Sequence, residues 1–332
     1  MIVNLEVTPG GGLILAREYR EACVARPRSN AAALCWAWED DSAKMISFVI
    51  TARDEQAAVV RRTVDELRAT TPAAERELIV VDDGSESPVA GLPADVEVVR
   101  AAVPGGVSRA RRLGCELAAG SVFVCLDAHM TFDAQWLDTM LEHVDSASLL
   151  CAAFWDYERV GRGYYGADFE WCAVRDYDAG VHPGFRPRHR SRPAGAGAPE
   201  VPMALGACYM LLRSSYEALG GFSPLFRTWG ADEQDLSLRA WMAGLGVRCV
   251  TDARVGHLSR GHTPYPVYFD QLEFNQLAMI RAAFDYRTVH RLEAFFEPLP
   301  GTVRSWLDEA DLGSWRPVVQ RARQMTDHEF LA

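Results

Sequence analysis

Short apolar runs alternate with segments of helical spacing between residues 45 and 144, and this alternation restricts the fold more than any other feature of the chain. The apolar runs predict buried strands over residues 46–50, 77–81, 96–99 and 122–126. The segments between and after them predict helices over residues 54–68, 108–119 and 133–144. Because strands alternate with helices, we expect an α/β fold with a mostly parallel, twisted sheet flanked by helices.

This regular pattern divides the 332-residue chain into three parts. Residues 1–44 come before it, and we expect an N-terminal extension that packs on the core. Residues 45–265 form the main domain. Residues 266–332 have helical apolar spacing, clearest from 272 to 284, and predict a C-terminal helical extension.

Charge and composition exclude several classes of protein. The chain has 45 acidic and 34 basic residues and a net charge of −11, which is unsuited to nucleic acid or an anionic membrane surface. No apolar run approaches the ~20 residues of a membrane helix, and the first residues lack a signal-peptide pattern. The eight cysteines are scattered without a C-x-x-C pair, which favours reduced thiols. We therefore expect a cytoplasmic protein without a membrane or nucleic-acid partner.

Acidic residues follow two of the predicted strands directly. Asp82 and Asp83 come after one strand, and Asp127 and His129 come after another. Ligands bind at the carboxyl ends of parallel strands, and mixed oxygen and nitrogen ligands suit Mn²⁺. Taken alone, each cluster could equally be turn chemistry.

Three carboxylates, Asp232, Glu233 and Asp235, precede or begin a helix expected over residues 232–243. One could cap the helix and another could pair with Arg239 four positions later. Surplus carboxylates near a metal site can instead serve as a general base or hold a substrate hydroxyl. His257, after a short strand expected at 248–250, gains meaning only as a third metal ligand.

These signals occur together in a known family. The chain resembles GT-A glycosyltransferases of the family 2 type, in particular the catalytic domain of polypeptide N-acetylgalactosaminyltransferases, without their lectin domain. The resemblance runs from about residue 46 to about 265 and rests on the motifs ISFVITARDE, LIVVDDGS, GGVSRARRLGCELAAGSVFVCLDAHMTFDAQWLDTML, GGFSPLFRTWGADEQDLSLRAW and RVGHLSRGHTPY. It implies the GT-A fold, a Rossmann-like fold of nucleotide-diphospho-sugar transferases.

The resemblance also implies roles for individual residues. Asp127, His129 and His257 would hold Mn²⁺ or Mg²⁺, which would bind the diphosphate of a UDP-sugar and act as a Lewis acid. The residues implied in donor binding are Thr51, Arg53, Asp82, Arg109, Asp127, Trp229, Arg260 and Tyr265.

One departure from the retaining family concerns stereochemistry. The family has W-G-G-E-N where this chain has Trp229-Gly230-Ala231-Asp232-Glu233. Glu233 thus places a carboxylate where inverting relatives carry the general base. We expect an inverting enzyme with Glu233 as base and Asp232 holding the sugar or the acceptor hydroxyl, and a retaining enzyme is the alternative.

The expected function is metal-dependent transfer of a sugar, such as an N-acetylhexosamine, from a UDP-sugar to a peptide or small-molecule acceptor. A sugar nucleotidyltransferase is a weaker alternative, because TARDE stands where its Gly-rich phosphate loop would follow the first strand. A non-catalytic nucleotide-sugar-binding module is a third.

Residues 186–202, rich in Arg, Pro, Gly and Ala, predict a mobile loop within the segment that would face the acceptor. Its basic cluster could meet an acidic acceptor, although a solvated loop is the favoured interpretation. The cluster consists of Arg186, Arg188, His189, Arg190 and Arg192.

Overall fold

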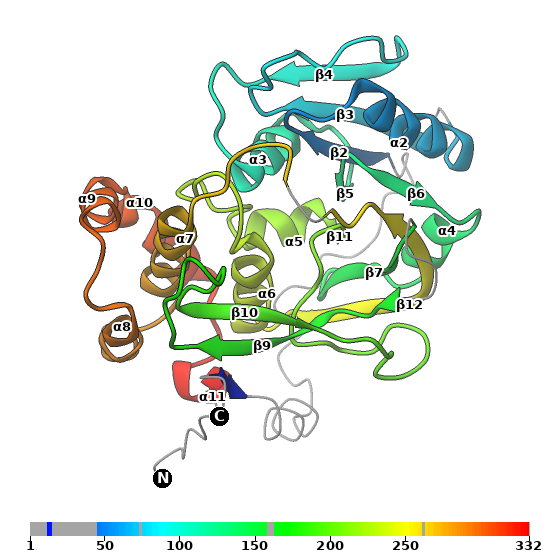
Figure 1. Cartoon of the computed structure of the whole chain (residues 1–332). Coiled ribbons are helices and arrows are strands. Elements are labelled where there is room, and N and C mark those ends of the chain that lie inside the picture. Colours follow the sequence, from blue (N-terminus) through cyan, green and yellow to red (C-terminus); the bar gives the residue numbers. More distant parts are fainter. Residues whose placement is uncertain (1–11, 15–44, 73–74, 158–162, 261–262, 332) are drawn as a thin grey trace.

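A nine-stranded mixed sheet forms the core of the computed structural model, which describes residues 12–14, 45–72, 75–157, 163–260 and 263–331. The strand order is β4-β3-β2-β5-β11-β7-β12-β6, and β8 pairs with β7 (Figure 1). The first half is parallel and confirms the expected strands, here β2 Ile46–Ala52, β3 Arg76–Asp82, β4 Val96–Arg100 and β5 Val122–Asp127. The expected α/β class is therefore confirmed, and the expected parallel pairing holds in this half of the sheet.

The second half of the sheet contains strands that the sequence pattern did not separate. β11 runs antiparallel between β5 and β7, while β7 and β12 are parallel to each other. β6 pairs antiparallel with the end of β12. Their bounds are β6 Met130–Phe132, β7 Ser148–Asp156, β8 Gly163–Tyr164, β11 Cys208–Leu212 and β12 Gly246–His257. β12 is thus far longer than the three-residue strand expected at 248–250, because a register shift within it lets polar residues continue the ladder.

Helices cover the sheet through small or apolar contacts. α3 packs on β2 and β3 so closely that a Cβ added at Gly114 would lie 2.3 Å from Cγ1 of Val49. α6 packs on β7 and β12 with most of its residues buried. The helices of the main domain are α2 Ala57–Thr70, α3 Val107–Leu117, α4 Trp136–Leu141, α5 Arg213–Ala218 and α6 Asp232–Met242.

A separate three-stranded sheet, in the order β1-β9-β10, lies beside α6 (Figure 1). It consists of β1 Gly12–Ile14, β9 Ala167–Cys172 and β10 Gly184–His189. The expectation of a loop over residues 186–202 is therefore wrong for 186–189, because backbone pairing with β9 holds this arginine-rich segment extended. The following residues are also anchored, since the Thr251 amide donates to the backbone oxygen of Gly197 at 2.8 Å.

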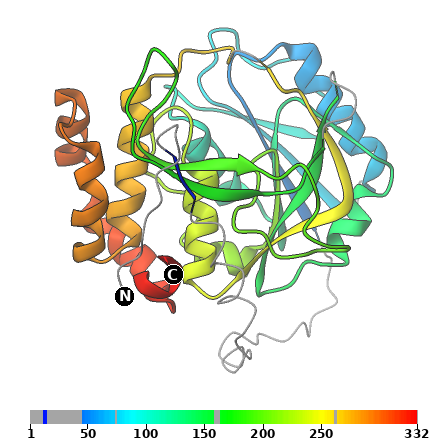
Figure 2. The same cartoon turned by 60° about the horizontal axis from the view of Figure 1, so that its bottom comes forward.

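The chain after residue 265 is largely helical, as expected, and both views show its orange-to-red helices beside the sheet, away from α2 (Figures 1 and 2). α7 packs against α6, α9, α10 and β10, so it belongs to the wall of the main domain. The helices are α7 Phe269–Ala283, α8 Tyr286–Glu293, α9 Gly301–Glu309, α10 Leu312–Ala322 and α11 Asp327–Leu331.

Of the expected N-terminal extension, residues 1–44, the structure describes only β1, which pairs with β9. The rest of the extension lies outside the described residues. Within the described part of the chain, no helix has the length and apolar character needed to cross a membrane.

Candidate functional site

A cavity of about 720 Å³ lies at the carboxyl ends of β2, β5 and β12. Parallel strands end on this edge, which is where the sequence places its acidic clusters. The start of α6, the strand β10 and the chain after β12 complete the wall. Six of the residues expected to bind the donor line it, namely Thr51, Arg53, Asp127, Trp229, Arg260 and Tyr265.

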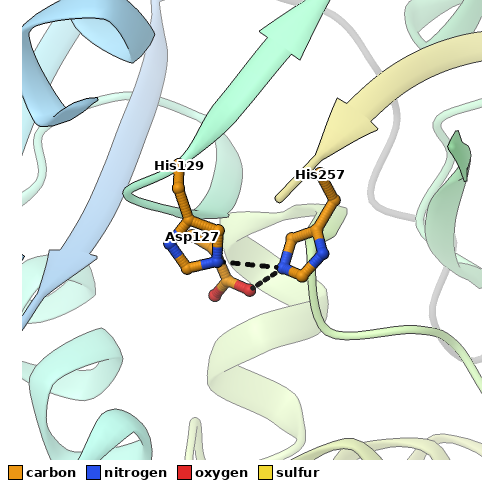
Figure 3. Close-up of side chains that lie close together, drawn as sticks. All are labelled: Asp127, His129 and His257. Carbon is orange, nitrogen blue, oxygen red and sulfur yellow. Dashed lines mark hydrogen bonds and ion pairs between the residues drawn. The ribbon is translucent and has the colours of Figure 1, made fainter. Parts of the chain in front are cut away.

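The three expected metal ligands lie together in this cavity, although they come from distant parts of the chain (Figure 3). Asp127 ends β5, His129 lies in the turn to β6, and His257 ends β12, which pairs with β6. Nε2 of His257 lies 3.1 Å from Nε2 of His129 and 3.2 Å from Oδ2 of Asp127. Two ligands bound at a right angle to one ion, each about 2.1 Å from it, are about 3 Å apart. The three atoms therefore have the spacing of neighbouring ligands on one cation.

A carboxylate that sequence analysis missed orients one of these ligands. Oε2 of Glu55 lies 3.0 Å from Nδ1 of His129, and Nη1 of Arg260 donates to the same oxygen at 2.8 Å. Burial raises the pKa of Glu55, but the hydrogen bonds from His129 and Arg260 outweigh it and bring the pKa to about 2. A charged carboxylate accepts only, so Nδ1 of His129 carries the proton and Nε2 offers its lone pair to a metal.

Arg111 of α3 is a second residue that sequence analysis missed. Its side chain is 2% exposed, and Nη2 donates to Oδ1 of Asp127 at 2.8 Å and to the backbone oxygen of Gly206 at 2.7 Å. Its Nη1 donates to Asp232. Burial raises the pKa of Asp127, but the hydrogen bond from His257 and the charge of Arg111 hold this pKa well below its usual range. Arg111 thus links the metal cluster to the start of α6.

Arg109, the arginine that the resemblance favoured, does not line the cavity. Its Nε donates instead to the backbone oxygen of Pro224 at 2.8 Å, on an exposed face. The helical period offered a signal, because Arg111 shares the buried face of α3 with Ala110, Gly114 and Cys115.

Asp82, which ends β3, and Asp83, which follows it, have different surroundings. Asp82 is buried outside the cavity lining and accepts from the amides of Ser85 at 2.9 Å and Val89 at 3.1 Å. Asp83 lines the cavity and accepts from the amide of Gly105 at 2.7 Å. Burial raises the pKa of Asp83. The structure therefore places Asp83 on the cavity, while Asp82 ends β3 outside the cavity lining.

Near Asp83, a cation stacks on an aromatic ring. The guanidinium carbon of Arg53 lies 4.6 Å from the ring centroid of Tyr265. Trp229 stands at the rim with 47% of its surface exposed. Flat faces of this kind can hold a base or a sugar ring.

The acids at the start of α6 serve different purposes. Asp235 pairs with Arg239, with Oδ2 and Nη2 2.6 Å apart, as the four-residue spacing predicted. Asp232 is held by Arg111. Glu233 lines the cavity, and its Oε1 accepts from the amide of Gly206 at 2.8 Å. Burial, and then the charge of Asp232, raises the pKa of Glu233 to about 8.

The residue before these acids has an unusual backbone. Ala231 is the N-cap of α6 with φ of 70°, in the left-handed region that favours glycine. The strain fixes the direction in which Asp232 and Glu233 leave the turn.

Comparison with known families gives two matches. Residues 47–220 match the family "Glycosyl transferase family 2", and residues 198–262 match "N-terminal domain of galactosyltransferase". Polypeptide N-acetylgalactosaminyltransferase 8 of Drosophila melanogaster is 28% identical over 236 residues, which are 65% of this chain and 38% of that protein. Polypeptide N-acetylgalactosaminyltransferase 11 of Xenopus tropicalis is 28% identical over 267 residues, 73% of this chain and 43% of that protein. The chain thus spans about two fifths of the length of these relatives.

Two solved structures have a similar fold. The crystal structure of GalNAc-T7 with UDP, GalNAc and Mn²⁺ superposes with a TM-score of 0.56 at 19% identity, covering 81% of this chain and 55% of that chain. The S. aureus TarS 1-349 complex with UDP-GlcNAc superposes with a TM-score of 0.50 at 13% identity, covering 83% of this chain and 90% of that chain. The expected GT-A fold is thereby confirmed.

Proposed function

The chain belongs to glycosyltransferase family 2, and from this membership we propose that it transfers a sugar from a UDP-sugar to an acceptor hydroxyl with the help of a divalent cation. The observation that carries the proposal is the Asp127, His129 and His257 cluster inside the cavity of about 720 Å³ at the strand ends. We propose an N-acetylhexosamine as the sugar, since the similar curated proteins are named for N-acetylgalactosamine transfer. The acceptor would be a peptide or a small molecule.

The residues present fit a cation. Asp127 supplies oxygen and the two histidines supply nitrogen, a donor set that suits Mn²⁺ and tolerates Mg²⁺. Glu55 adds the carboxylate–histidine contact that is typical around bound metals. Once bound, such an ion neutralises diphosphate charge and favours departure of UDP as a Lewis acid.

We assign the rest of donor binding to the lining residues. Thr51, Asp83, Arg53 and Tyr265 line the wall proposed for the uridine, and Trp229 stands at the rim proposed for the sugar. Asp83 and Arg111 replace Asp82 and Arg109 in this proposal, because they are the members of each pair that line the cavity.

For the chemical step we propose inversion with Glu233 as general base. The acceptor hydroxyl gives its proton to the Glu233 carboxylate while its oxygen bonds to the anomeric carbon. The bond from that carbon to the diphosphate oxygen breaks, and its electron pair leaves with UDP. A base works best with a pKa near the working pH, and burial brings that of Glu233 to about 8. Asp232, held by Arg111, would position a sugar or acceptor hydroxyl.

The test is release of UDP from UDP-GalNAc or UDP-GlcNAc with and without Mn²⁺. We expect release that stops in EDTA, and at least ~10-fold slower release in His129→Ala, because a metal ligand is lost. The control is His290→Ala, an exposed histidine of α8. Full activity in EDTA would overturn the metal role, and activity only with UTP and a sugar phosphate would indicate a nucleotidyltransferase.

Stereochemistry is tested separately by NMR of the product. A β-linked product from the α-linked donor supports inversion. An α-linked product would instead support the retaining chemistry expected as the alternative.

A further inference from the structure

The wall of the cavity contributed by β10 and the turn before it differs in charge from the rest. The carboxylates that line the cavity are Glu55, Asp83, Asp127, Asp232 and Glu233, and all lie after β2, β3 and β5 or at the start of α6. The lining residues between 180 and 189 include no carboxylate but contain His182, Arg186 and His189. The lining residues from 258 to 276 also lack a carboxylate, but their Arg260 pairs with Glu55, so in a chain with a net charge of −11 Arg186 is the cation that needs a reason.

β10 is fixed next to the helix that carries the proposed base. The backbone oxygen of Phe185 accepts from Nε2 of Gln234 at 3.1 Å and from Nε2 of Gln276 at 2.9 Å. The amide of Phe185 donates to Oε1 of Gln276 at 3.0 Å. Phe185 directly precedes Arg186, and Gln234 directly follows Glu233. The bond between Phe185 and Gln234 therefore holds the strand segment with Arg186 against the helix turn with Glu233.

The side chain of Arg186 is directed by strand geometry. Successive side chains of a strand point to opposite faces. Phe185 is 1% exposed and packs edge-on against Trp171 at 4.9 Å between ring centroids. Arg186 therefore points to the other face of the strand, and both residues line the cavity.

Arg186 also differs from the arginines around it. Arg188 and Arg190 both pair with Asp168, whereas no salt bridge or hydrogen bond of Arg186 is found within the described part of the chain. Glu170 lies opposite it in the ladder without an ion pair to it in that part, and the buried Glu273 is taken by Arg175, with Nε and Oε1 2.6 Å apart.

His182 lies close enough to feel this charge. Burial lowers the pKa of His182, and the positive charge of Arg186 lowers it further. Nδ1 of His182 lies 2.9 Å from the backbone oxygen of Pro183, so a neutral His182 donates its single N–H there and adds no second charge beside Arg186.

We propose that the acceptor carries an anionic group, a carboxylate or a phosphate, close to the hydroxyl that receives the sugar, and that Arg186 binds this group. The inference rests on the proposed function, because it assigns the β10 wall to the acceptor. A guanidinium without a carboxylate partner is suited to bind such oxyanions through paired hydrogen bonds. Binding there would hold the acceptor against the helix that carries Glu233.

The test uses paired probes that differ only in charge. One arm compares glycerol 3-phosphate with glycerol, and the other compares a short threonine peptide containing Glu with the same peptide containing Gln. The readout is the rate of UDP release from the UDP-sugar in the presence of Mn²⁺. A bound probe raises this rate if it accepts the sugar, and lowers it if it only displaces the water that hydrolyses the donor. The variants are Arg186→Gln and the matched control Arg188→Gln, from the same strand but outside the cavity lining.

We expect the anionic member of at least one pair to act at a concentration ~10-fold or more below that of its neutral partner, as a charged hydrogen bond predicts. Arg186→Gln should remove this preference and Arg188→Gln should keep it, with both variants melting near the temperature of the unaltered protein. Equal response to both members in both arms, or a preference that survives Arg186→Gln, would overturn the proposal.

Failure of the proposed function gives a different result. In that case no variant releases UDP from any UDP-sugar. NMR then measures how tightly the same probes bind to the protein and to both variants in the presence of UDP and Mn²⁺. Tighter binding of the anionic probe that is lost in Arg186→Gln supports the proposal, and equal binding of both probes overturns it.

Discussion

Two carboxylates in one cavity, Asp127 at the end of β5 and Glu233 at the start of α6, are in opposite electrostatic situations. Asp127 is next to His257 and Arg111, which keep it charged. Burial, and then the charge of Asp232, raises the pKa of Glu233 to about 8, although the amide of Gly206 donates to it. The difference teaches that the surroundings of an acid decide its chemistry. A carboxylate with a lowered pKa stays charged and can bind a cation, whereas one with a pKa near the working pH can take up and release a proton.

Replacing the acid at the α6 end should have the largest effect. Glu233→Gln keeps the shape and the contact with Gly206 but removes the base, so we expect transfer to fall ~10²–10⁴-fold with donor binding intact. Transfer rate and UDP-sugar affinity are measured together. Glu217→Gln, on the exposed face of α5, is the control. Turnover close to that of the unaltered enzyme, with only a change in stability, would leave Glu233 as a helix-start residue.

The same comparison predicts how stability depends on pH. The folded-state pKa of Glu233 is raised, so its contribution is fully present below the unfolded value near 4.5 and is lost as pH rises through about 8. The lowered pKa of Asp127 and Glu55 acts only at lower pH, where their contributions are lost on acidification. Between pH 5 and 8.5 we expect the unaltered protein without metal to lose about 4 kcal/mol more of its free energy of unfolding than Glu233→Gln does. Chemical denaturation of both proteins measures this, and parallel curves would contradict the assignment.

At the metal end, removing the contact that orients His129 should weaken the cation without removing a ligand. Glu55→Gln is expected to lower Mn²⁺ affinity ~10–100-fold, because the amide cannot fix the histidine as the carboxylate does. Calorimetric titration with Mn²⁺ gives the affinity, and Glu116→Gln, from a surface pair with Arg112, provides the comparison. Unchanged affinity would show that Glu55 serves only Arg260.

The smallest effect concerns the turn that aims the α6 acids. Ala231→Gly should stabilise the fold by ~0.5–1 kcal/mol, because φ of 70° costs alanine more than glycine. Ala240→Gly, inside the same helix, should instead destabilise by a similar amount. Thermal and urea unfolding separate the two, and destabilisation by Ala231→Gly would mean that the alanine methyl is needed for packing.

The sequence predicted the Asp127, His129 and His257 cluster better than the wall formed by β10, for a physical reason. Asp127 and His129 follow a buried strand directly, so local pattern places them at the sheet edge. His257 is 128 positions from His129 and reaches it through the pairing of β6 with β12, which local pattern does not predict; only the resemblance pointed to His257 as a ligand.

Other parts could not be predicted because tertiary contacts override composition. β10 contains three basic residues and a proline among six, a composition typical of a loop, yet pairing with β9 makes it a strand. The choice of Asp83 over Asp82 depends on which carboxylate the turn directs inward, and both have the same local sequence context.

The chain of contacts from Arg260 through Glu55 to His129 has a thermodynamic consequence. The segment after β12 and a ligand of the cation share one carboxylate, so their equilibria are linked. A ligand that favours the contact of Arg260 with Glu55 must raise the affinity for the cation, and the cation must raise the affinity for that ligand by the same factor. Nucleotide and cation would then bind cooperatively, with neither reaching its full affinity alone.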